Sequence, residues 1–127
     1  MEKLLLQQTA KTPYICFDAN NGTFEVAGKC IPEFAIEFFG PIKNWLDRFE
    51  QEDVSCPIVV NFKFDYYNTA SSKCILDFFT KLKNVSQKVN VTINWYYKED
   101  DDDMLESGRD WEELFRLPFN YIEEICT

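Results

Sequence analysis

Residues 67–73 contain several hydroxyl and amide side chains close together, which could bind an anion or accept a phosphate. It reads Tyr67-Asn68-Thr69-Ala70-Ser71-Ser72-Lys73. A strand pattern ends where this segment begins and a helix pattern follows it, so these side chains are expected at a strand-to-helix junction. The first turn of a helix carries unpaired N–H groups and a partial positive charge, which favours anions. A phosphate added to Thr69 would bring about −1.5 to −2 charges to that point.

Other interpretations of Thr69 stay open on composition alone. Threonine and serine are ordinary N-cap residues, so composition alone favours Thr69 as the cap of the helix, in a chain that serves as a structural, assembly or adaptor subunit. Binding of a small anion or nucleotide is a further alternative. The Gly-x-x-x-x-Gly-Lys spacing of a P-loop does not occur in the sequence, so that alternative has no motif behind it.

An enzyme is not the expected class. The sequence contains no histidine, which removes the commonest general base and every catalytic triad built on it. The enzymatic alternative that remains is a small carboxylate-dependent hydrolase using Asp65 and Asp77, which flank the junction. Nothing in the spacing of these two carboxylates brings them together. We therefore predict a binding protein rather than a catalyst.

No metal or cofactor is expected either. The five cysteines are odd in number, widely spaced and accompanied by no Cys-x-x-Cys pair, so the sequence predicts buried thiols in a reducing cytoplasm rather than a zinc site or a disulfide framework. They are Cys16, Cys30, Cys56, Cys74 and Cys126. The acidic run from Glu99 to Asp103 lacks the spacing of an EF-hand loop. It is expected to form the solvated N-terminus of a helix.

The bulk properties favour one domain that spans residues 1–127. The chain is 46% hydrophobic and 17% aromatic, which is enough material for a core. Its net charge of −9 makes nucleic acid and anionic membranes poor partners. No apolar run approaches the roughly 20 residues that cross a bilayer. The three leucines of the opening segment are too few for a signal peptide, so a cytoplasmic location is expected.

Hydrophobic periodicity predicts the elements that position the junction. Alternating patterns indicate six strands, with Asn21-Gly22 as a hairpin turn between the second and third. The strands are expected at Leu4–Thr9, Tyr14–Asp18, Thr23–Ala27, Ile58–Tyr66, Val91–Tyr97 and Phe119–Ile125. Helical stripes indicate four helices, because Gly40-Pro41 breaks the first stripe in two. They are expected from Pro32 to Gly40, near Ile42–Phe49, near Cys74–Leu82 and from Glu99 to Phe115.

This order of elements predicts an α/β fold, with a mixed β-sheet covered by helices. A helix connects the strand at Ile58–Tyr66 with the strand at Val91–Tyr97, so these two strands are expected to pair in parallel if they are neighbours. The aromatic residues near their ends are expected to pack, and those that face outward near Thr69 would suit a protein interface.

The sequence resembles the SiaC-like bacterial regulatory phosphoproteins. Residues 67–73 are similar to the Asn-Thr-Ser-Ser motif of that family, and further segments match in the same order along almost the whole chain. They are Lys11-Thr12-Pro13, Gly28-Lys29-Cys30-Ile31-Pro32-Glu33, Asn94-Trp95-Tyr96-Tyr97, Asp103-Met104-Leu105-Glu106-Ser107-Gly108 and Pro118-Phe119. Ala70 and Cys30 depart from the pattern, because serines would be expected at both positions.

The resemblance implies a non-catalytic signalling switch with a STAS-like fold and the partner-switching logic of anti-sigma-factor antagonists. It implies that Thr69 is phosphorylated by a partner Ser/Thr kinase and dephosphorylated by a PP2C-like phosphatase. The unphosphorylated form would bind and activate a target such as a diguanylate cyclase, which controls c-di-GMP signalling and biofilm formation or aggregation. Residues around the phosphoacceptor would contact these partners. They are Tyr67, Asn68, Ser71, Ser72 and Lys73.

Overall fold

The strands of the protein form one sheet in which they lie in the same order as in the sequence. A computed structural model of the chain describes residues 1–125. The strands are β1 (Leu4–Leu6), β2 (Tyr14–Asp18), β3 (Thr23–Cys30), β4 (Ile58–Tyr67), β5 (Val91–Lys98) and β6 (Phe119–Glu124). The helices are α1 (Ala35–Gln51), α2 (Thr69–Val85) and α3 (Asp102–Phe115).

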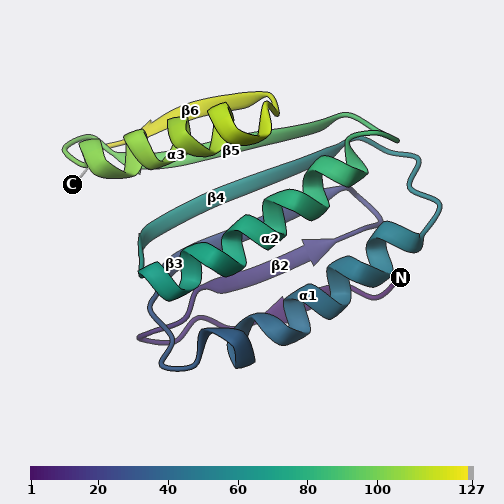
Figure 1. Ribbon diagram of the computed structural model, residues 1–127, viewed down its shortest axis with the longest axis horizontal. Coiled ribbons are helices and arrows are strands. Elements are labelled where there is room, and N and C mark those ends of the chain that lie inside the picture. The colour runs from purple at the N-terminus through teal and green to yellow at the C-terminus, as the bar shows by residue number, and fades with distance from the viewer. Residues whose placement is uncertain (126–127) are drawn as a thin grey trace.

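The sheet is mixed, as the sequence predicts. Strands β1, β2 and β3 pair antiparallel, and β3, β4, β5 and β6 pair in parallel. Each parallel connection contains one helix, and right-handed crossovers between neighbouring strands place all such helices on the same face of a sheet. Figure 1 shows α1, α2 and α3 side by side on one face, which gives a two-layer STAS-like α/β fold. The N-termini of α1 and α2 follow the C-terminal ends of adjacent parallel strands, so they lie at the same edge of the sheet.

The hairpin between β2 and β3 confirms the Asn21-Gly22 turn signal. Asp18 pairs with Thr23, and the amide of Gly22 donates to the Asp18 carbonyl oxygen at 3.0 Å. Only Gly22 adopts a positive φ in this loop, at 74°, whereas the two-residue turn typical of Asn-Gly needs a positive φ at both positions. The loop is therefore longer than the shortest hairpin turn.

Helix α1 corrects the prediction of two helices separated at Gly40-Pro41. It is continuous from Ala35 to Gln51 and contains Pro41 in its interior. Proline removes one helical hydrogen bond, but here the apolar stripe continues across it, because Phe39 and Ile42 are both buried against the core. Packing of this shared stripe outweighs the lost bond, and the helix starts at Ala35 instead of Pro32.

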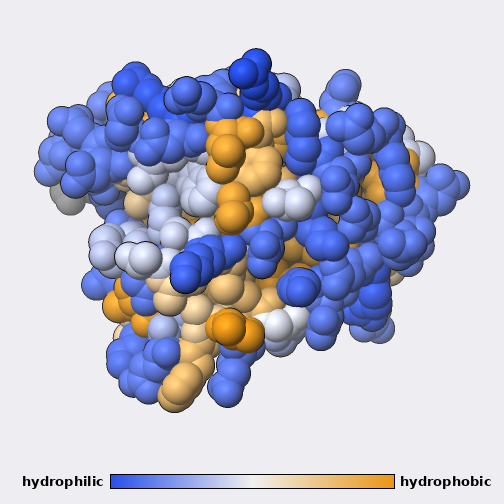
Figure 2. All heavy atoms as spheres, in the orientation of Figure 1, coloured by the Kyte–Doolittle hydropathy of each residue, from blue (hydrophilic) through white to orange (hydrophobic). Residues whose placement is uncertain are grey.

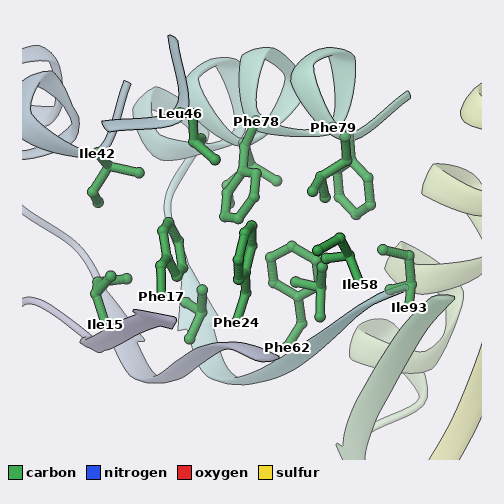
Figure 3. Packing of buried hydrophobic residues seen from close by; sticks show 14 of the residues in the cluster. Ile15, Phe17, Phe24, Ile42, Leu46, Ile58, Phe62, Phe78, Phe79 and Ile93 are labelled. Carbon is green, nitrogen blue, oxygen red and sulfur yellow. The ribbon is translucent and has the colours of Figure 1, made fainter. Parts of the chain in front are cut away.

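The core lies between the helices and the sheet and is unusually aromatic. Phe17 and Phe24 stack with their ring centroids 4.9 Å apart, and Phe62 contacts Phe78 at 5.4 Å and Phe79 at 5.1 Å. Figure 3 shows the strand residues pointing toward the residues of α1 and α2 in two facing rows. Burial of this apolar area holds α2, and with it the junction, against the sheet.

The remaining expectations from the sequence have mixed outcomes. Asp101 caps α3 by accepting from the Met104 amide at 3.0 Å, so the acidic run does form a helix N-terminus. Within residues 1–125, no group of three or more histidine, cysteine or carboxylate side chains could hold a metal. The prediction of uniformly buried thiols was wrong, because Cys30 is buried but three others are half-buried, namely Cys16, Cys56 and Cys74. Cys126 lies outside the described residues.

None of the helices within residues 1–125 is long and apolar enough to span a bilayer.

Candidate functional site

The junction between β4 and α2 is built around Asn68. Strand β4 ends at Tyr67, Asn68 has extended torsion angles (φ −86°, ψ 170°), and α2 begins at Thr69. The Asn68 side-chain oxygen accepts from the Ser71 amide at 2.9 Å, which satisfies one of the N–H groups that a helix leaves unpaired at its start. The backbone amide of Asn68 donates to the Cys30 carbonyl oxygen at 3.1 Å. One residue therefore caps α2 and ties it to the end of β3.

A buried contact below the first turn of α2 fixes the junction from inside. Ser71 is fully buried, and the Cys30 thiol donates to the Ser71 hydroxyl oxygen over 3.4 Å. Burial raises the pKa of the Cys30 thiol to about 11, despite the opposing effect of its hydrogen bond to Ser71. The thiol consequently stays protonated at neutral pH and remains a donor. Ser71 supports the junction from below and does not reach its surface.

The outer side of the same turn presents Thr69 to solvent. Thr69 is exposed, and within residues 1–125 its hydroxyl makes no hydrogen bond, although its carbonyl oxygen accepts from the Ser72 hydroxyl at 2.9 Å. Lys73 is exposed one turn later, and the first turn contains no acidic residue. In a chain of net charge −9, this end of α2 is locally positive. The arrangement leaves a hydroxyl accessible to a modifying enzyme at a point that stabilises a phosphate.

Tyr67 connects the junction to α3. Its hydroxyl oxygen accepts from the Trp111 indole N–H at 3.1 Å, and its ring lies 5.1 Å from the Phe64 ring. Tyr67 is half-buried, whereas 58% of Tyr66 is exposed. Of the two tyrosines before the junction, Tyr66 is therefore the more exposed.

The structure corrects two alternatives from the sequence. Thr69 is not the cap of α2, because Asn68 takes that position and makes the capping hydrogen bond. Asp65 and Asp77 do not converge as a hydrolase would need. Asp65 pairs with Lys98 at 3.3 Å, whereas Asp77 lies on α2 and lines a groove shared with α1.

The division of roles between Asn68 and Thr69 leads to a prediction about stability. Asn68→Ala removes the cap and is expected to lower the free energy of unfolding by about 1 kcal/mol. Thr69→Ala removes an exposed hydroxyl without a partner and is expected to change it by less than about 0.5 kcal/mol. Urea unfolding followed by circular dichroism measures both. Equal losses in the two variants would show that Thr69 contributes to the cap after all.

The sequence did not reveal the apolar surface at the start of α1. Phe34 and Ile36 are 66% and 84% exposed, and Ile36 lines a groove between α1 and α2 with a volume of about 300 Å³. The available signal was that Ile36 falls outside the buried stripe of α1. The groove itself depends on how two helices pack, and no local pattern encodes that packing.

The relatives of the chain agree with this fold. A family model described as "SiaC family regulatory phosphoprotein" matches residues 6–124. An uncharacterized protein of Pseudomonas aeruginosa (strain UCBPP-PA14) is 28% identical over 120 residues, which cover 94% of each chain.

Solved structures from the same organism are similar throughout. The crystal structure of apo-SiaC from Pseudomonas aeruginosa superimposes with a TM-score of 0.85 at 27% identity, covering 96% of this chain and 99% of the other. SiaC in the crystal structure of the diguanylate cyclase SiaD in complex with its activator SiaC gives a TM-score of 0.87 at 26% identity, covering 95% and 99%. Because the family model spans almost all of the sequence, the chain belongs to the SiaC family of regulatory phosphoproteins.

Proposed function

We propose that this protein is a cytoplasmic switch that activates a diguanylate cyclase when Thr69 is unphosphorylated. A partner Ser/Thr kinase adds the phosphate to Thr69, and a PP2C-like phosphatase removes it. The protein itself serves as substrate and ligand and performs no catalysis. The observation that carries the proposal is the exposed Thr69 hydroxyl, which has no hydrogen bond within residues 1–125 and stands on the first turn of α2.

Two features support this role for Thr69. The capping hydrogen bond is made by Asn68, so the Thr69 hydroxyl is not needed to stabilise the start of α2. The helix start and Lys73 create a site at which a phosphate is stabilised, and phosphorylation is the modification that defines the family. A relative of the chain is the activator of a diguanylate cyclase in a crystallised complex, which supports the same class of target here.

Mass spectrometry of protein isolated from its native cells tests the modification. We expect a fraction of the chains to carry one phosphate, and peptide fragmentation to place that phosphate on Thr69. The Thr69→Ala protein should carry none while unfolding at the same urea concentration as the wild type. Phosphate on Ser72 or another residue, with Thr69 bare after treatment with the partner kinase, would contradict the proposal.

An activity assay tests the target. The unphosphorylated protein should increase the production of c-di-GMP by a diguanylate cyclase of the same organism, and protein phosphorylated on Thr69 should not. The Thr69→Ala variant serves as the control, because it should activate the cyclase with or without the kinase. If phosphorylation does not change activation, the protein activates the cyclase but is not controlled through Thr69, and the switch is contradicted.

A further inference from the structure

The side of the sheet that faces away from the helices, here called the outer face, carries a row of side chains that crosses all the strands. These side chains point away from the core, because their neighbours along each strand pack into it. The helices lie on the other side of the sheet (Figure 1) and leave the outer face uncovered. From β1 to β6, the register aligns Leu5, Cys16, Glu25, Asn61, Asn94 and Asn120.

The last three members of this row form a ladder of side-chain amides. Asn94 donates to the Asn61 oxygen at 2.9 Å, and Asn120 donates to the Asn94 oxygen at 3.1 Å. A side-chain amide has two N–H donors and an oxygen that accepts two hydrogen bonds, so each ladder contact uses only one of the two donors. A row of amides can therefore pair with an identical row. An interface between identical chains requires this property, because a two-fold axis brings the same residues from both sides.

The charges of the outer face compensate one another. Each carboxylate that the described strands place on this face has a lysine beside it. Glu124 lies opposite Lys98 in the register of β5 and β6. The other ion pairs are Lys3–Asp18 at 4.0 Å, Lys63–Glu25 at 2.9 Å and Lys98–Asp65 at 3.3 Å. The outer face is therefore close to neutral, although the chain as a whole has a net charge of −9.

The excess of negative charge lies on the helices and loops instead. The run from Glu99 to Asp103 leads into α3, and α3 itself contains more carboxylates than basic side chains. Figure 2 shows hydrophilic side chains crowded around α3 on the helical side of the molecule. A second copy that approached this side would meet charge of its own sign, whereas a copy that approaches the outer face meets a neutral surface. The charge distribution thus favours the outer face for contact between copies.

The outer face also has the composition and the size of a protein interface. It carries Tyr14, Tyr66 and Tyr96, and tyrosine is enriched at interfaces. Tyr66 is 58% exposed and Leu5 is 49% exposed. Strands about 4.8 Å apart make the sheet about 24 Å wide, and its longest strands run for about 26–33 Å. With shorter strands at both edges, this area is close to the roughly 600 Å² per partner at which specific interfaces begin.

We propose that two copies of this chain associate reversibly through their outer faces, sheet against sheet and about a two-fold axis. Twisted sheets that face each other pack with their strands about 30° apart, which suits two copies of the same sheet. The helical layers of both copies then point outward, in an arrangement of four layers. The inference goes beyond the proposed function and does not depend on it, because no residue of the β4–α2 junction is needed for the contact.

The dimer leaves Thr69 accessible on both copies. Thr69 begins α2 in the helical layer, and it is exposed. Two switch sites then stand on opposite sides of one particle, so the dimer is bivalent for any protein that recognises the junction. Phosphorylation of Thr69 is accordingly expected to change the dissociation constant of the dimer by less than about twofold.

Sedimentation equilibrium of the purified protein measures the association. Between about 1 and about 500 µM, the average mass is expected to rise from the 15.0 kDa of one chain toward about 30 kDa. Raising the NaCl concentration from about 0.05 to about 0.5 M should tighten the dimer, because salt screens the repulsion between two acidic chains. A mass of one chain at every concentration would overturn the inference. So would a dimer that salt dissociates, because ion pairs between the copies would then hold it together.

A matched pair of variants locates the interface. Ala27 lies on β3 near the middle of the outer face, aligned with Tyr14 and Lys63 on the neighbouring strands. Ala27→Glu is expected to weaken the dimer at least about tenfold, because each copy adds a carboxylate to the contact. Ala70→Glu makes the same change at an exposed position of α2 and should alter the dissociation constant by less than about twofold. Circular dichroism checks that both variants are folded, and equal dissociation constants for the two would overturn the inference.

The native cysteines locate the interface without any substitution. Cys16 belongs to the row on the outer face, Cys74 lines the groove between α1 and α2, and both are half-buried. A short pulse of excess N-ethylmaleimide, quantified by mass spectrometry, reports the access to each thiol. As the protein concentration rises through the association, labelling of Cys16 is expected to slow at least about threefold while labelling of Cys74 stays constant. A dimer in which Cys74 is protected and Cys16 is not would place the contact on the helical layer and overturn the inference.

Discussion

Replacing Gly22 by alanine is expected to lower the free energy of unfolding by about 3 kcal/mol, measured by urea denaturation. Gly22 has a φ of 74°, where an L-residue with a side chain costs about 1 kcal/mol or more. A methyl group there would lie 2.3 Å from the Pro57 carbonyl oxygen, a backbone atom that cannot rotate away. The hairpin must therefore move, and overpacking of this kind adds about 1–3 kcal/mol.

The same movement disturbs the start of the parallel sheet. The carbonyl oxygen of Gly22 accepts from the Val59 amide at 2.8 Å, at the point where β3 begins to pair with β4. Gly40→Ala is the matched control, because a methyl group at Gly40 meets nothing within 4 Å, and it should change stability by less than about 1 kcal/mol. A loss below about 1 kcal/mol for Gly22→Ala would show that the hairpin yields easily.

The elements around the junction were predictable because their patterns are local. Strand β4 alternates buried and partly exposed residues as its sequence does, and α2 carries its apolar stripe at helical spacing. The parallel pairing of β4 with β5 follows from the helix that connects them, and the structure confirms it. The final strand at 119–124 is also confirmed.

The continuity of α1 was not predictable from local rules. Pro41 is a helix breaker by its own chemistry, and the sequence around it reads as a boundary. The helix continues because Phe39 before it and Trp45 after it are buried against the same core, together with Phe24 and Phe17, which come from strands. Whether a helix continues through a proline depends here on contacts between separate elements, and the sequence of one segment does not contain them.

The candidate site also has features that the sequence predicts and features that depend on the fold. The motif and its place between a strand and a helix are visible in the sequence. Which residue caps α2 depends on the backbone torsion angles of Asn68, and the burial of Ser71 depends on Cys30, which lies 41 positions earlier. The pattern of hydroxyl side chains therefore located the site but did not separate its exposed member, Thr69, from its supporting member, Ser71.

Phosphorylation of Thr69 is expected to weaken cyclase binding at least about 100-fold, which corresponds to about 2.7 kcal/mol. The phosphate would carry about −1.5 to −2 charges, held at the start of α2 by the free amide groups of the first turn and by Lys73. A cyclase surface that covers the start of α2 would have to remove water from the phosphate oxygens that these groups do not pair, and that desolvation is costly.

The measurement is calorimetric titration of the cyclase with protein that carries phosphothreonine at position 69. Thr80→Asp is the matched control, because Thr80 is also an exposed threonine of α2 but lies eleven positions further along, and binding should change by less than about threefold. The phosphorylated protein should melt at the same temperature as the unmodified protein or higher, since an anion stabilises a helix N-terminus. A lower melting temperature would mean that the phosphate acts by unfolding α2. Unchanged affinity would mean that Thr69 lies outside the interface, and that its phosphate controls some other contact of the protein.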